Sequence, residues 1–243
     1  AIGTDLQHIN WPQRTLNRSM NIFKIKTIPV VGWSSKDAFN MRPPLRAVFW
    51  LFIGLFLFGV GETMLIGAGI GVTPWTVLAQ GFAATLDIGI GAATFWVSVL
   101  ILLLWLPLSQ KPGFGTLSNV VIVAATIEFL LPYIPEPDDY LVRLAQTVLG
   151  TLIVGIGSGI YLVANLGPGP RDGLMTGLQR FTGRPIFCVR TFIEFSSVIC
   201  GWLLGGTVGI GTLIFALGTG PAVSAGLYLT ANCSGHRLCS KAD

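Results

Sequence analysis

The sequence contains one short pattern twice, as GIGVTPWTVLAQG at residues 69–81 and as NLGPGPRDGLMTG at residues 165–177. In each stretch a glycine-rich approach leads to a proline, and proline is well suited to the first turn of a helix. The pattern therefore predicts short helices over residues 74–86 and 170–182. At about 1.5 Å per residue each helix is about 20 Å long, which is too short to cross the roughly 30 Å hydrocarbon core of a bilayer.

The two stretches belong to a longer internal repeat with an offset of 96 residues. Twelve residues recur 96 positions later without a gap: Gly54, Gly59, Gly61, Gly71, Pro74, Leu78, Gly81, Ile90, Gly113, Gly115, Thr116 and Leu117. Recurrence in one register is the signature of a duplicated structural unit. We therefore predict two copies of one unit, a first membrane repeat over residues 43–135 and a second over residues 139–230.

The composition places both copies in a membrane. Hydrophobic residues make up 52% of the chain and charged residues only 11%, and the mean hydropathy is +0.71. A soluble domain carries about a quarter charged residues, so this chain lacks the polar surface that a globule of its size needs in water. Turn signals divide its uncharged runs into segments of about the length of a span. The expected spans are residues 46–66, 91–109, 114–131, 141–163, 187–204 and 210–229.

The number of spans in each copy predicts the topology. Each copy has one span, one short helix and two further spans. Because three crossings is an odd number, the second copy must enter the membrane from the opposite side, as in the inverted repeats of secondary transporters. With both termini in the cytoplasm, most Lys and Arg residues lie on the inner side, as the positive-inside rule requires. We predict an all-α bundle of six transmembrane spans and two short re-entrant helices, arranged as an inverted repeat.

The two ends of the chain lie outside this pattern. Residues 1–42 carry six basic and two acidic side chains and no apolar run typical of a secretory signal. We interpret them as a basic cytoplasmic extension, or as the product of a translation start upstream of Met41, and expect little bearing on function. Residues 231–243 are predicted to be a cytoplasmic tail. Three possible metal ligands near a chain end are a weak signal, so we expect neither a metal nor a cofactor. These three residues are Cys233, His236 and Cys239.

Ionisable residues within the spans are candidates for coupling or gating. Glu194 is expected near the middle of a span, where an ionised carboxylate is costly unless it is paired or hydrated. Arg190 precedes it by four residues, the spacing at which side chains on one helix meet. Two roles are therefore open for this pair: it couples or gates transport, or it is a structural ion pair whose charges neutralise each other. Glu62 is the third candidate, although it lies nearer a span end, where an interfacial or packing role is expected, as for Glu128.

The approach to the second short helix is the candidate substrate site. Free N–H groups and the positive end of a helix that begins at Pro170 attract an anion, and Arg171 strengthens that attraction. A re-entrant helix that binds no ligand is the alternative. A nucleotide-binding loop would need a preceding strand, and the pattern predicts none. The candidate substrate-binding residues are Gly167, Gly169, Arg171 and Asp172, with Thr73 and Trp75 at the corresponding place in the first copy.

Four runs carry a resemblance to a known family: GAGIGVTPWTVLAQG, LGPGPRDGLMTGLQRFTGRP, VRTFIE and GWLLGGTVGIGTLIFALGTGP. They resemble the YczE/YyaS/YitT family of bacterial integral membrane proteins, over roughly Arg46 to Pro221. The resemblance implies a multi-pass protein of the bacterial inner membrane and implies no particular biochemical activity.

The sequence favours a transporter that moves a small solute, with an anion as the favoured class, by rocking of two inverted halves. The alternative is a non-transporting membrane scaffold or regulator. An enzyme is not expected, because the two histidines lie outside the spans and no HExxH or GxSxG motif is present. The expected partners are the lipid bilayer and the solute, with no nucleic acid. Glycines at a spacing of four favour close helix packing, either within one chain or in a homodimer.

Overall fold

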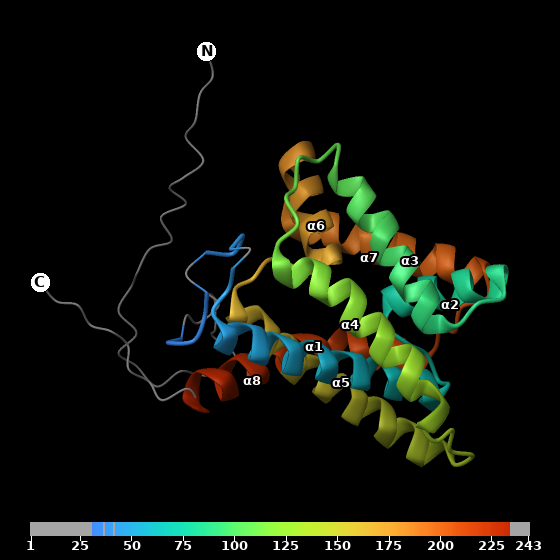
Figure 1. Cartoon of the computed structure of the whole chain (residues 1–243). Helices are drawn as coiled ribbons and strands as arrows, with labels where there is room; N and C mark the ends of the chain where they lie inside the picture. Colours follow the sequence, from blue (N-terminus) through green and yellow to red (C-terminus); the bar gives the residue numbers. More distant parts are fainter. Residues whose placement is uncertain (1–30, 36, 41, 234–243) are drawn as a thin grey trace, which may run out of the picture.

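A computed structural model describes residues 31–35, 37–40 and 42–233 of the chain (Figure 1). Every regular element within these residues is helical, so the predicted all-α class is confirmed. The elements in order are α1 (Leu45–Ala68), α2 (Pro74–Leu86), α3 (Ile90–Trp105), α4 (Phe114–Leu130), a 3₁₀ turn η2 (Leu131–Tyr133), α5 (Tyr140–Ala164), α6 (Pro170–Thr182), α7 (Ile186–Leu203) and α8 (Ile210–Cys233).

The helices agree with a multi-pass membrane protein. Five of them, α1, α4, α5, α7 and α8, are long and apolar enough to cross a bilayer. A sixth crossing results if α2 and α3, which meet at an angle of 111°, are counted as one broken span. The short helices α2 and α6 have the predicted bounds. Helix α3 ends at Trp105, four residues before the predicted end of its span, because Pro107 has no N–H to donate to the helical ladder.

The two short helices are preceded by backbone that only glycine adopts readily. Gly71 and Gly167 have φ angles of 116° and 111°, a region in which a Cβ atom would clash. These residues let the chain fold back from α1 into α2 and from α5 into α6. Helix α2 then begins at a Thr73 cap, whose hydroxyl accepts a hydrogen bond from the Thr76 N–H at 3.2 Å. The short helices thus begin inside the bundle and not at its surface.

Helices α1 and α5 cross at the centre of the bundle with their backbones in contact (Figure 1). A Cβ atom added to Gly157 would lie 2.6 Å from the Gly54 carbonyl oxygen, and one added to Gly61 would lie 2.6 Å from that of Gly150. A residue early in α1 therefore lies beside a residue late in α5, and the two helices run antiparallel. Glycine at these positions permits the close approach.

Contacts between the two halves occur in pairs that are related by the offset of 96 residues. The Gly211 N–H donates to the Ile70 carbonyl at 2.9 Å, and the Gly115 N–H donates to the Leu166 carbonyl at 2.6 Å. Helix α2 packs against α7, and α6 packs against α3. Each short helix therefore packs against a helix of the other half: α2 against α7, which follows α6, and α6 against α3, which follows α2.

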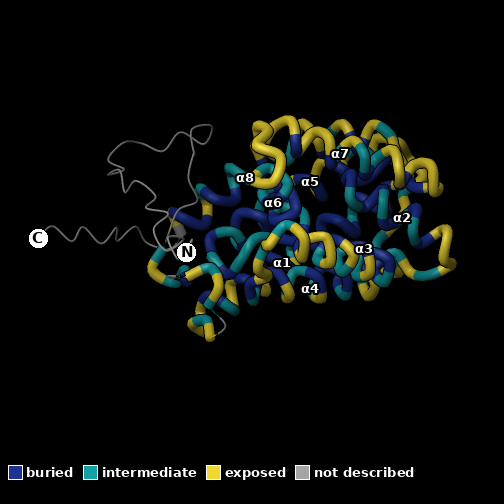
Figure 2. The backbone as a smooth tube through the Cα atoms, turned by 90° about the horizontal axis from the view of Figure 1, so that it is seen from above, coloured by how far each residue is buried: buried dark blue, intermediate teal, exposed yellow. Residues whose placement is uncertain are grey.

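The two halves differ at their outer helices. Helix α3 packs on α4, and the Glu128 carboxylate on α4 accepts a hydrogen bond from the Ala92 N–H at 3.1 Å in the first turn of α3. Glu128 therefore links α4 to the first turn of α3, and an interfacial or packing role for it stays a prediction. Helices α7 and α8 make no comparable contact within the described chain, and Figure 2 shows most of α7 as exposed. Its exposed side chains are largely apolar, which suits contact with lipid.

The described part of the N-terminal extension is attached to the bundle. The Ser35 N–H donates to the Ala164 carbonyl at 3.0 Å, and the Asn165 side chain donates to the Ser35 carbonyl at 2.9 Å. Trp33 stacks on Trp50 of α1 with ring centroids 5.7 Å apart. Residues 31–35 therefore pack at the junction between α5 and the approach to α6. Residues 1–30, His236 and Cys239 lie outside the described residues.

Candidate functional site

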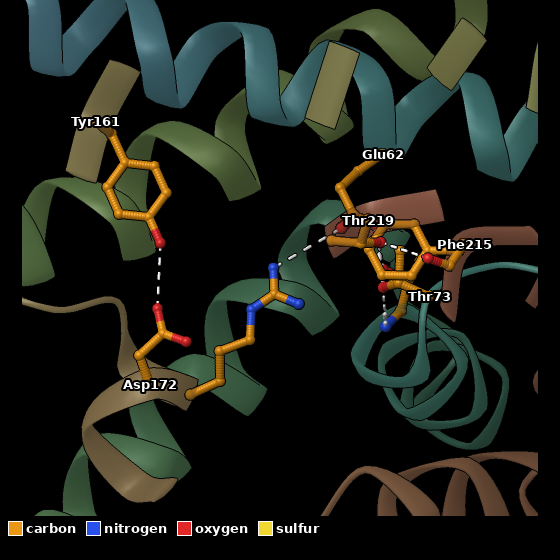
Figure 3. Close-up of polar contacts among 8 residues, drawn as sticks. Glu62, Thr73, Tyr161, Asp172, Phe215 and Thr219 are labelled. Carbon is orange, nitrogen blue, oxygen red and sulfur yellow. Dashed lines mark hydrogen bonds and ion pairs between the residues drawn. The ribbon is translucent and has the colours of Figure 1, made fainter. Parts of the chain in front are cut away.

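Glu62 is a buried carboxylate inside the bundle, six residues before the end of α1. Its exposed fraction is 2%. Its Oε2 atom accepts a hydrogen bond from the Thr76 hydroxyl at 2.6 Å and one from the Thr73 hydroxyl at 3.2 Å; Figure 3 labels Glu62 and Thr73. Both hydroxyls belong to the first turn of α2, so the carboxylate faces the positive end of that helix, where negative charge is favoured.

Arg171 faces Glu62 from the second half of the chain. Its Nη2 atom lies 3.8 Å from Glu62 Oε1, a distance that suits an ion pair but exceeds a hydrogen bond. The guanidinium also lies over the Phe58 ring, 4.9 Å from its centroid, where the ring quadrupole attracts a cation. Within the described part of the chain it makes no hydrogen bond, so its N–H groups remain available as donors. Its side chain is 27% exposed.

Asp172, the next residue, belongs to a separate contact. Its Oδ2 atom accepts a hydrogen bond from the Tyr161 hydroxyl of α5 at 3.1 Å (Figure 3). The Tyr161 ring packs edge-on against Phe58, with centroids 6.4 Å apart. The first turn of α6 is therefore held to α5 on one side while Arg171 reaches toward α1.

A cavity of about 50 Å³ lies between α1, α2, α3, α4 and α6. One water molecule needs about 10–15 Å³ of such space, so the cavity holds a few waters or one small ion. Its wall includes apolar side chains such as Phe58 and Ile127. Its polar lining consists of Glu62, Trp75, Thr76, Thr94, Ser98, Asn119 and Arg171.

The cavity wall has N–H donors without acceptors. The Trp75 Nε1 atom is buried and has no hydrogen-bond partner in the described chain, and Arg171 retains its donors as described above. The one carboxylate of the lining, Glu62, accepts two hydroxyl hydrogen bonds at Oε2, and its charge is balanced by Arg171 opposite Oε1. A buried donor without a partner costs about 1–3 kcal/mol. The lining is therefore better matched to an added acceptor, such as a small anion, than to a cation.

Three of the predicted substrate-binding residues, Thr73, Trp75 and Arg171, lie around Glu62 and the cavity. The other three lie in the approach and first turn of α6. Gly167 packs against Thr116 and Gly113, Gly169 lies beside Asp172 and Tyr161, and Asp172 itself bonds to Tyr161.

Arg190 and Glu194 lie elsewhere. They form the predicted ion pair on α7, with Nε and Oε1 3.0 Å apart, but their side chains are 59% and 33% exposed. Neither residue lines the cavity. The geometry thus shows a pair that neutralises itself, and a coupling or gating role for it stays a prediction.

Sequence reasoning did not find Phe58, Tyr161 or Asn119. Phe58 carries one usable signal, because it precedes Glu62 by four residues and so lies on the same helical face. Tyr161 and Asn119 carry none, because a lone polar or aromatic residue in a span is read as packing.

The fold and the site define a class: a multi-pass, all-helical membrane protein with an ion pair and a small cavity inside the bundle. A family model described as a family of unknown function, DUF6198, matches residues 45–226. The chain belongs to this family, and the predicted resemblance to YczE-like bacterial membrane proteins is confirmed.

Three relatives have similar sequences. An uncharacterized protein of Haemophilus influenzae is 34% identical over 208 residues, which cover 86% of this chain and 94% of that protein. The uncharacterized membrane protein YczE of Bacillus subtilis is 33% identical over 184 residues, covering 72% and 82%. The uncharacterized protein YyaS of Bacillus subtilis is 25% identical over 167 residues, covering 67% and 83%. No solved structure shows significant similarity to the chain.

Proposed function

We propose that the protein is a transporter of the bacterial inner membrane, and that it moves a small anionic solute through the cavity beside Arg171. One observation carries the proposal. The cavity wall presents the Arg171 guanidinium and the buried Trp75 N–H, which has no partner in the described chain. Of the carboxylate opposite them, Oε2 already accepts from Thr73 and Thr76 and Oε1 faces Arg171 at 3.8 Å. An anion would supply the missing acceptors, and charge-assisted hydrogen bonds of this kind are the strong ones.

Alternating access would come from two inverted halves. The antiparallel crossing of α1 and α5, and the contacts that recur 96 residues later, support an inverted repeat with an axis at that crossing. In this arrangement α2 and α6 are re-entrant from opposite faces, with their N-termini directed inward. Discontinuous helices with inward N-termini are typical of anion sites in secondary transporters. The Glu62–Arg171 pair joins the two halves and would break and re-form as they rock.

The proposal places both termini in the cytoplasm and Glu62 within the hydrocarbon layer. A helix of 24 residues is about 36 Å long, so Glu62 lies about 9 Å from the outer end of α1. The basic residues of the N-terminal segment then lie on the inner side, where positive charge is favoured.

Flux through proteoliposomes tests this function. The purified chain should carry formate, nitrite or chloride, and Arg171→Gln should reduce the flux about tenfold or more, because a hydrogen bond from a charged group to the anion is lost. Arg180→Gln is the matched control, since it removes the same charge from an exposed residue at the other end of the same helix, outside the cavity lining, and its flux should equal that of the wild type. Absence of flux in the wild type, or equal flux in Arg171→Gln, would refute the proposal.

A second function, a non-transporting scaffold or regulator, has one observation in its favour. Helix α7 is the least buried of the candidate spans, and it makes no extensive contact with α8. Its exposed apolar residues, including Phe187, Phe192 and Phe195, form a face that a second membrane protein or a second copy of the chain could cover. This reading predicts a stoichiometric partner in detergent extracts, and loss of that partner when Phe192 is changed to Ser.

A further inference from the structure

We propose that the cavity binds a small monovalent anion together with one proton, and that the proton is carried by Oε1 of Glu62. The inference rests on the proposed function, because it needs an anion beside Arg171. Beyond the proposed function, it specifies that the coupled ion is a proton, that the solute is monovalent and that Glu62 takes up the proton.

The two oxygens of Glu62 differ in their contacts. Oε2 accepts hydrogen bonds from both Thr76 and Thr73. Oε1 has no hydrogen bond in the described chain and faces only the Arg171 guanidinium at 3.8 Å. A proton that binds Glu62 therefore binds at Oε1, where it displaces no donor. The protonated Oε1–H then becomes a further donor at the cavity, beside those of Arg171 and Trp75.

The cavity is small, so the charges that line it must balance with little help from water. Without an anion, the carboxylate of Glu62 and the guanidinium of Arg171 sum to zero. An anion beside Arg171 would bring a second negative charge close to Glu62, and like charges that share a buried site do not both remain ionised. One proton taken from the solvent converts the carboxylate to a carboxylic acid, and the sum of Glu62, Arg171 and a monovalent anion is again zero. A dianion would leave the site with an unbalanced charge.

The other titratable groups near α1 are engaged elsewhere. On α6, Asp172 bonds to Tyr161 of α5. On α4, the Glu128 carboxylate accepts from the Ala92 N–H, and on α5, Arg143 donates to the Pro137 carbonyl. Helix α2 has no titratable side chain; it contributes the hydroxyls of Thr73 and Thr76 and the Trp75 N–H. Glu62 is therefore the group whose protonation responds to an anion at Arg171.

The size of the cavity limits the anion. A space of about 50 Å³ suits an anion of a few heavy atoms, such as a one-carbon carboxylate, a small oxyanion or a halide. Binding of one such anion with one proton is electroneutral, so transport would follow the pH gradient and would not respond to the membrane potential.

Titration calorimetry of the full chain in lipid nanodiscs tests the coupling. Formate, nitrite and chloride are titrated at neutral pH in HEPES and in Tris, whose ionisation enthalpies differ, so that the difference in heat counts the protons bound with each anion. We expect one proton per anion in the wild type. Glu62→Gln should bind the anion with no proton uptake, and Arg171→Gln should bind it about tenfold more weakly or not at all. Glu136→Gln removes an exposed carboxylate outside the cavity lining; it is the control and should behave as the wild type.

Each outcome has a distinct meaning. Anion binding without proton uptake in the wild type overturns the coupling and leaves the proposed anion transporter standing. Proton uptake that persists in Glu62→Gln overturns the assignment to Glu62. No binding of any of the three anions overturns the anion site, and the proposed function with it. The wild-type proton count needs no variant, so it stays decisive if Glu62→Gln fails to fold.

Discussion

Replacing Arg171 with Gln should destabilise the protein, because it leaves the carboxylate of Glu62 buried without its counter-charge. At 3.8 Å and an effective dielectric constant of about 20, the Coulomb attraction of the pair is about 4 kcal/mol. Two factors reduce the net loss. The guanidinium is 27% exposed, and Thr73 and Thr76 continue to donate to the carboxylate. We expect a loss of about 2 kcal/mol, below the roughly 3–5 kcal/mol typical of a fully buried pair.

The double variant Glu62→Gln/Arg171→Gln separates this effect from a loss of packing. It removes both charges, so it should recover at least half of the stability lost in the Arg171→Gln variant, with a coupling energy of about 1–3 kcal/mol. The control is the exposed pair on α7, where Arg190→Gln should cost no more than about 0.5 kcal/mol.

The free energy of unfolding is measured in mixed micelles with increasing SDS, followed by circular dichroism and tryptophan fluorescence. The reasoning is wrong if Arg171→Gln is as stable as the wild type. It is also wrong if the double variant is no more stable than Arg171→Gln alone, because the loss would then come from the arginine side chain and not from an unpaired carboxylate.

Three further variants test other contacts by the same unfolding measurement. Thr76→Val removes the 2.6 Å hydrogen bond to Glu62 and should cost about 1–3 kcal/mol; a neutral result would contradict the described carboxylate environment. Gly157→Ala puts a methyl group 2.6 Å from the Gly54 carbonyl oxygen and should cost about 1–3 kcal/mol of stability. Its control is Gly220→Ala, where the added methyl group meets nothing within 4 Å; that variant should be neutral or stabilising by up to about 1 kcal/mol. Equal effects of the two variants would argue against the α1–α5 crossing. Trp75→Phe removes a buried donor that has no partner in the described chain. The relief of that donor, about 1–3 kcal/mol, opposes the loss of packing by the larger indole ring, so stability should not fall by more than about 1 kcal/mol while anion affinity falls. Unchanged affinity would exclude Trp75 from the site.

Local signals predicted the elements well. The prolines at positions 74 and 170, each after a glycine-rich approach, predicted both short helices with their observed bounds. The prediction for Glu62 was less accurate, since its place near the end of α1 suggested an interfacial or packing role. It is buried because α2 begins inside the bundle and turns its first hydroxyls toward α1, an arrangement set by tertiary packing.

Glu194 on α7 differs in the opposite direction from Glu62, because it is more exposed than its position along the helix suggested. Glu194 is central in its helix, as predicted, but the depth of a residue does not say which face it occupies. Helix α7 packs on α2 and α6 and makes no extensive contact with α8, so the Arg190–Glu194 pair lies on its exposed side. Which face of a span is covered depends on partners far away in the sequence, as does the contact between Arg171 and Phe58.

Labelling of single cysteines tests the inversion of the two halves most directly. Asp138→Cys and Arg180→Cys are made in a background without the native cysteines and treated in intact cells with a maleimide that cannot cross the membrane. We predict that position 138 is labelled in intact cells, and that position 180 is labelled only after the membrane is permeabilised. Labelling of both positions from the same side would contradict an inverted pair of halves and the transport route between them.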